Sequence, residues 1–114
     1  MIRKLMLALA SLCLLSFTSA ALADETLSNS ELQKLFPGSF TAVVNGIVVI
    51  EIIAKDNGIL IGRMKGKVDS GRWSLRNGKL CIMWSNWTDG KSSCSLVVAE
   101  NGWYRGQGVK FRKL

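Results

Sequence analysis

Residues 71–98, GRWSLRNGKLCIMWSNWTDGKSSCSLVV, have the pattern of three consecutive strands joined by tight turns. The polar and apolar residues alternate from Arg72 to Arg76, as is typical of a half-buried strand. Asn77-Gly78 then predicts a two-residue hairpin turn, because both central residues of such a turn need positive φ. A second hairpin is centred on the turn-rich run Asn86–Gly90. The stretch therefore predicts an antiparallel meander.

The two cysteines of this meander predict a disulfide. Cys81 and Cys94 are equally far from the midpoint between Trp87 and Thr88. In a hairpin about that midpoint they face each other on neighbouring strands, where a disulfide can form. The alternative is a pair of free thiols for redox chemistry or metal binding. Because the spacing is not C-x-x-C and the sequence has no histidine to complete a metal site, we expect neither a metal nor a cofactor.

The N-terminus has the pattern of a secretory signal peptide. The basic pair Arg3-Lys4 precedes an apolar run from Leu5 to Phe17, and the small-residue motif Ala21-Leu22-Ala23 follows. We expect a signal peptide over residues 1–23, cleavage after Ala23 and a mature domain over residues 24–114. The apolar run is shorter than the roughly 20 residues of a membrane span, although an uncleaved anchor is the alternative. These features predict a periplasmic or secreted protein with no transmembrane segment in the mature chain.

The charge of the mature chain suggests anionic partners. Loss of Arg3 and Lys4 lowers the 15 basic residues to 13, against 8 acidic residues, which leaves a net charge of +5. A positive balance favours anionic lipid, lipopolysaccharide or acidic glycans, and nucleic acid is not expected for an exported protein. The alternative is that the charge only keeps a small β-protein soluble and protects its sheet edges.

One short helix and a series of strands are expected. Ser28 and Glu31 match a capping box at the start of a helix over Thr26–Phe36, and Pro37-Gly38 ends it. Turn signals then recur about every 8 to 12 residues, which is typical of an all-β domain. We expect a small up-and-down barrel of the lipocalin or avidin kind, or a sandwich, with about seven or eight strands. The expected strands are 39–44, 47–55, 59–67, 72–76, 79–85, 91–98, 103–107 and 109–113.

The sequence offers little for catalysis. The absence of histidine excludes a Ser-His-Asp triad. Glu51 is a lone carboxylate among branched aliphatic residues, where burial would raise its pKa. No second carboxylate is placed to work with it, and the alternative is that it pairs with a basic residue or points outward. Four other carboxylates are expected in turns, where such residues bond to the backbone: Asp56, Asp69, Asp89 and Glu100. We therefore expect no enzyme activity.

Aromatic and basic residues are the better candidates for a binding site. Trp84 and Trp87 flank a hairpin tip close to Lys91, where an exposed indole ring could stack on a sugar or a lipid head group. Three basic residues alternate onto one face of the strand expected over residues 59–67. The alternative for the tryptophans is packing in the core or at its rim. The candidate ligand-binding residues are Trp84, Trp87, Lys91, Arg63, Lys65 and Lys67.

The order of these motifs resembles a family of small, functionally uncharacterised exported β-domain proteins of Gram-negative bacteria. The resemblance lies in a helix of the form Leu27-Ser28-x-x-Glu31-Leu32 before Phe36-x-Gly38, a strand that starts Gly71-x-Trp73, the motif Asn77-Gly78-x-Leu80-Cys81, and Cys94. It implies a periplasmic β-domain with one disulfide. It implies no particular activity.

Three functions from different classes follow. The leading one is a non-enzymatic binding protein for an amphipathic or anionic ligand of the cell envelope. The second is a protein–protein module, such as an inhibitor of lysozyme or of another hydrolase, although lysozymes of the common type are basic and would be repelled by a basic partner. The third is an enzyme that works through Glu51.

Overall fold

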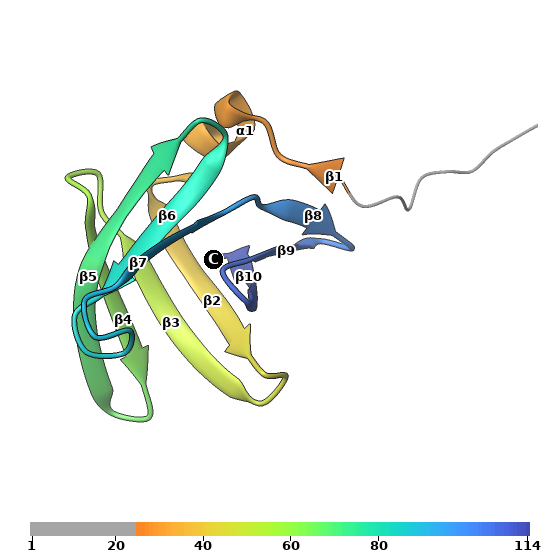
Figure 1. Cartoon of the computed structure of the whole chain (residues 1–114). Coiled ribbons are helices and arrows are strands. Elements are labelled where there is room, and N and C mark those ends of the chain that lie inside the picture. The colour runs from red at the N-terminus through yellow and green to blue at the C-terminus, as the bar shows by residue number, and fades with distance from the viewer. Residues whose placement is uncertain (1–24) are drawn as a thin grey trace, which may run out of the picture.

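A computed structural model describes residues 25–114 as one antiparallel sheet of ten strands with a single helix (Figure 1). The expected signal peptide, residues 1–23, lies outside the described residues. The elements are β1 Glu25–Thr26, α1 Asn29–Leu35, β2 Gly38–Val44, β3 Val48–Ala54, β4 Ile59–Met64, β5 Lys67–Arg76, β6 Lys79–Trp84, β7 Ser92–Ser95, β8 Val98–Glu100, β9 Trp103–Gly106 and β10 Val109–Lys113. The expectation of an all-β domain with one N-terminal helix is confirmed.

The meander of residues 71–98 forms as its sequence predicts. β5 pairs with β6 across the Asn77-Gly78 turn, whose residues have φ of 50° and 77°. β6 pairs with β7 in a register that places Cys81 directly opposite Cys94, and a disulfide joins them. Both the hairpin register and the cysteine pairing expected from the sequence are confirmed.

The prediction of a single strand over residues 59–67 is wrong, because a turn divides this segment. β4 ends at Met64, and Lys65 and Gly66 follow with φ of 48° and 79°. These left-handed residues reverse the chain, so Lys67 begins β5 and pairs with Met64. Lysine rarely occupies a turn position with positive φ, so only Gly66 indicates this turn in the sequence.

The ten strands form one sheet in the order β1-β8-β9-β10-β2-β3-β4-β5-β6-β7, and the sheet curls into a half-barrel (Figure 1). The strand count exceeds the seven or eight expected for two reasons. β1 is a two-residue strand, and the segment expected as 91–98 divides where the chain leaves its pairing with β6 and pairs with β9 instead. Since all strands described for residues 25–114 belong to one sheet, the sandwich alternative is wrong.

Helix α1 covers one end of the half-barrel (Figure 1). Ser28 caps it as expected: its hydroxyl accepts from the Glu31 backbone N–H, and the Glu31 carboxylate accepts from the Ser28 backbone N–H. At the other end of the helix the Lys113 ammonium donates to the carbonyl of Leu35 at 3.1 Å. Leu32 and Leu35 turn inward and are buried, so the exposed face of this short helix is its polar one.

The core lies beneath this helix. The rings of Phe36, Phe40 and Phe111 form a contiguous cluster with centroid separations of 4.8 to 6.3 Å. Leu32 is fully buried against them, and Leu60 belongs to the same cluster. The half-barrel is therefore filled at the α1 end. The opposite end, where the β2–β3 and β4–β5 turns lie, is called the mouth below (Figure 1).

Candidate functional site

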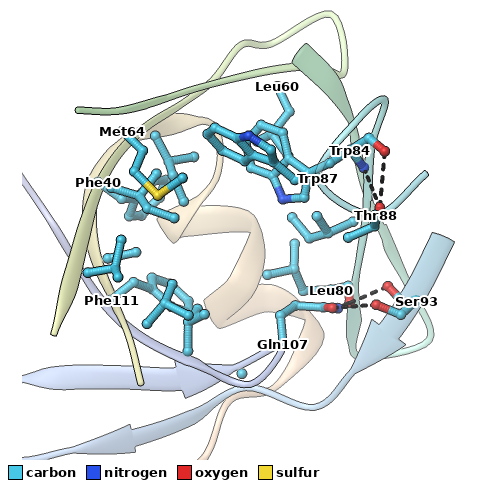
Figure 2. A pocket seen from close by; sticks show the side chains of 18 of the residues that line it. Phe40, Leu60, Met64, Leu80, Trp84, Trp87, Thr88, Ser93, Gln107 and Phe111 are labelled. Atoms are coloured by element: carbon cyan, nitrogen blue, oxygen red, sulfur yellow. Dashed lines mark hydrogen bonds between the residues drawn. The ribbon is translucent and has the colours of Figure 1, made fainter. Parts of the chain in front are cut away.

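A cavity of about 490 Å³ occupies the half-barrel between the aromatic core and the mouth (Figure 2). Its wall consists of the inward-facing, alternate residues of β2, β3, β4, β6 and β10, which are mainly aliphatic and aromatic. Ile50 and Ile52 of β3 line one side of the cavity, and Leu80 and Ile82 of β6 line the other. None of the described residues that line the cavity carries a charge. This volume lies within the roughly 300 to 1,000 Å³ range of small-molecule pockets in proteins, whose walls are likewise mainly apolar.

Trp84 and Trp87 lie on the wall of this cavity and not at an exposed hairpin tip (Figure 2). Trp84 is the last residue of β6 and points inward by the alternation of that strand, whereas Trp87 comes from the loop of residues 85–91, which folds back over the cavity. The ring centroids are 4.9 Å apart. A Cβ atom at Gly62 would come within 2.6 Å of Trp87 and 2.7 Å of Trp84, so glycine leaves the space that both rings fill.

Asp69 holds the loop of residues 85–91 in place. Its carboxylate, only 4% exposed, accepts hydrogen bonds from the backbone N–H groups of Trp87 at 2.9 Å and Asn86 at 3.0 Å, and from the Asn86 side-chain amide at 3.1 Å. The Ser70 N–H donates at 2.9 Å. Desolvation raises the pKa of Asp69, but these hydrogen bonds outweigh it and hold the pKa below the ordinary value.

The structure corrects the expectation that Asp69 lies in a turn. It is an interior residue of β5 and faces inward with Gly71 and Trp73. The strand expected from Arg72 begins instead at Lys67, and the alternation of buried and exposed residues along it includes Asp69. The main hydrogen-bond donors to the carboxylate come from a loop about 17 residues further along the chain, and no local sequence pattern predicts this contact.

The few polar side chains on the wall have partners within the protein. The amide nitrogen of Gln107 donates to the carbonyls of Leu80 at 2.7 Å and Ser93 at 2.9 Å, and its amide oxygen accepts from the Ser93 hydroxyl at 2.6 Å (Figure 2). These bonds link the β9–β10 turn to β6 and β7 and thereby join two distant parts of the curled sheet. The Thr88 hydroxyl accepts from the Trp84 N–H at 3.1 Å and lies 3.0 Å from the Trp84 carbonyl.

Two polar groups on the wall differ from the rest. Among the described residues, the indole N–H groups of Trp84 and Trp87 donate no hydrogen bond. Trp73, by contrast, donates its indole N–H to the carbonyl of Lys55 at 2.7 Å. The indole pair on the cavity wall therefore leaves two donors to a water molecule or a ligand.

The four basic candidates do not share one strand face. Arg63 is exposed on the outer face of β4, and Lys65 is in the β4–β5 turn. Lys67 opens β5 opposite Met64, which lines the cavity, so it lies at the mouth. Lys91 is exposed at the end of the loop that carries Trp87, and its N–H donates to the carbonyl of Thr88. The expected alignment of Arg63, Lys65 and Lys67 is wrong because the turn at Lys65-Gly66 interrupts the strand.

Glu51 is not buried among its aliphatic neighbours. It is exposed on the outer face of β3, where the register places it opposite Thr41 on one side and Arg63 on the other. The outward position, beside a basic residue on the neighbouring strand, is the alternative that the sequence left open for Glu51, and Val49 and Ile53 share the same outer face. Residues 25–114 contain no group of three His, Cys, Asp or Glu side chains that could hold a metal ion.

Comparisons with known proteins identify no relative: no family model, no curated protein and no solved structure matches this chain. Within the described part of the chain, no helix is long and apolar enough to cross a membrane.

Proposed function

We propose that this protein is a non-enzymatic binding protein of the periplasm or the extracellular space that holds the apolar chain of an amphipathic, anionic envelope ligand in its half-barrel. It would work in the manner of small up-and-down barrels of the lipocalin or avidin kind. The disulfide between Cys81 and Cys94 supports an exported location, because such bonds persist in oxidising compartments. We further expect that the protein belongs to the family of small exported β-domain proteins that its motifs resemble.

The single observation that carries the proposal is the chemistry of the cavity wall. A space of about 490 Å³ is lined by apolar side chains, and the side-chain amide of Gln107 and the hydroxyl of Thr88 have their partners within the protein. A ligand segment that enters this space gains from leaving water and meets few groups that demand hydrogen bonds. A hydrocarbon chain meets this description better than a sugar or a peptide does.

The polar end of the ligand would lie toward the indole pair and the mouth. The N–H groups of Trp84 and Trp87 have no acceptor among the described residues, so an ester carbonyl or a carboxylate could accept from them. Lys67 and Lys65 lie at the mouth and add positive charge for an anionic head group. We therefore expect the ligand to place hydrogen-bond acceptor oxygens near the two indole rings and a negatively charged group near the lysines.

Titration with a series of saturated fatty acids tests the proposal, with tryptophan fluorescence or calorimetry as the readout. Each added methylene that enters the cavity contributes about 0.8 kcal/mol, so the affinity should rise about fourfold per carbon until the cavity is full. The matched variants are Ile50→Trp, which fills the cavity, and Val49→Trp, which adds the same side chain to the outer face of the same strand.

Loss of binding in Ile50→Trp with normal binding in Val49→Trp is the expected result. Affinity that does not depend on chain length, or equal effects of the two variants, would refute the cavity as the binding site. Trp87→Phe tests the head group, since it keeps an aromatic ring and removes one N–H donor. We expect it to weaken decanoate binding more than binding of the matching alkane.

A further inference from the structure

The mouth carries exposed apolar side chains beside lysines. Ile47, 83% exposed, is the last residue of the β2–β3 turn and directly precedes Val48, which lines the cavity. Val68, 61% exposed, lies one residue beyond Lys67 at the start of β5. Turn residues are ordinarily polar, whereas Ile47 is aliphatic, and Val68 lies on the outer face of β5 opposite Arg63, so two branched aliphatic side chains expose apolar surface at this end. We call Ile47, Lys65, Lys67 and Val68 the mouth surface.

The lysines of the mouth surface are available to an outside partner. Within the described residues, no carboxylate lies at ion-pair distance from Lys65 or Lys67, whereas Arg105 and Glu100 on the far side of the sheet do form a salt bridge of 3.0 Å. Both lysines adjoin the cavity-lining residue Met64: Lys65 follows Met64 in the chain, and Lys67 pairs with Met64 across the turn. Apolar and cationic side chains thus occur together where the cavity reaches the surface.

We propose that the mouth surface docks onto an anionic lipid bilayer. Ile47 and Val68 would enter the boundary between head groups and acyl chains, and Lys65 and Lys67 would contact the lipid phosphates. The partner follows from charge complementarity: the chain is basic, and its mouth combines unpaired cations with exposed aliphatic groups. A soluble anion would pair with the lysines but would leave the aliphatic side chains in water.

Docking in this orientation gives the cavity direct access to lipid. A ligand chain would then pass between the bilayer and the half-barrel without crossing bulk water, which strongly disfavours free hydrocarbon. This consequence rests on the proposed function, whereas the docking itself does not, because it can be measured with vesicles that contain no ligand beyond their own phospholipids.

Co-sedimentation of the mature chain with vesicles tests the docking. Vesicles of phosphatidylcholine alone are compared with vesicles that contain phosphatidylglycerol. Each lysine near an anionic surface contributes about 1 kcal/mol, so Lys65→Gln/Lys67→Gln should weaken binding to the anionic vesicles roughly thirtyfold. The matched control is Arg76→Gln/Lys79→Gln, which removes the same charge at the β5–β6 turn beside α1 and should change binding less than threefold.

A second pair of variants tests the apolar part. Ile47→Ser/Val68→Ser should weaken vesicle binding at least tenfold, whereas Ile53→Ser, on the outer face of β3 away from the mouth, should leave it unchanged. Equal binding to neutral and anionic vesicles, or equal effects of the mouth and control variants, would overturn the proposal. A chain that binds fatty acids but no vesicle also overturns docking, whereas one that binds vesicles but no fatty acid overturns only the proposed function.

Discussion

Replacing both disulfide cysteines, Cys81→Ala/Cys94→Ala, should destabilise the domain by about 3 kcal/mol. The bridge closes a loop whose ends are 13 residues apart. In the chain-entropy model, a loop of this length restricts the unfolded state by roughly 10 cal/mol/K, which at 25 °C gives about 3 kcal/mol. For a domain of this size, that loss lowers the melting temperature by on the order of 12 to 24 °C.

The variant should still fold, because the β6–β7 register also rests on the pairing of Leu80 with Ser95 and of Ile82 with Ser93. Guanidinium unfolding followed by tryptophan fluorescence measures the free-energy change. Wild-type protein kept reduced is the control, since it retains both sulfur atoms and loses only the crosslink. Refutation would be a loss below about 0.5 kcal/mol in both samples, which would mean that the unfolded chain is already restricted here without the bridge.

Three further perturbations test the packing and the electrostatics. The pKa of Asp69 lies below its ordinary value of 3.8, so its contribution to stability should be present above pH 3.8 and disappear as the pH falls through the folded-state pKa. Asp69→Asn should reduce this acid sensitivity in urea unfolding at successive pH values, and an unchanged pH dependence would contradict the role assigned to the carboxylate. Leu32→Ala should cost about 2 to 5 kcal/mol, because Leu32 is fully buried between α1 and the sheet; a loss under 1 kcal/mol would show that the helix is not part of the core. Glu51→Gln should change the unfolding free energy by no more than about 0.5 kcal/mol and leave fatty-acid binding intact, since the side chain is exposed on the outer face; lost binding would bring Glu51 back into the site.

Features that depend on a few neighbouring residues could be predicted from the sequence. The Asn77-Gly78 turn follows from the backbone conformations those two residues tolerate, and the capping box of Ser28 and Glu31 lies within one turn of helix. The pairing of Cys81 with Cys94 follows from the symmetry of one hairpin. The turn at Lys65-Gly66 escaped prediction because lysine carries a weak signal for positive φ.

The candidate site depends on the curvature of the sheet, which could not be predicted from the sequence. Trp87 lines the cavity from a loop whose backbone bonds to Asp69 of β5, and Gln107 joins the wall to β6 and β7 through partners 14 and 27 residues away. Glu51 is exposed, one of the two positions the sequence left open, and Asp69 is buried in a strand although a turn was expected, since burial depends on which face of a strand the curvature encloses. Short-range conformational preferences thus determined most of the strands and turns and the disulfide, whereas long-range packing decided which loop and side chains close the cavity.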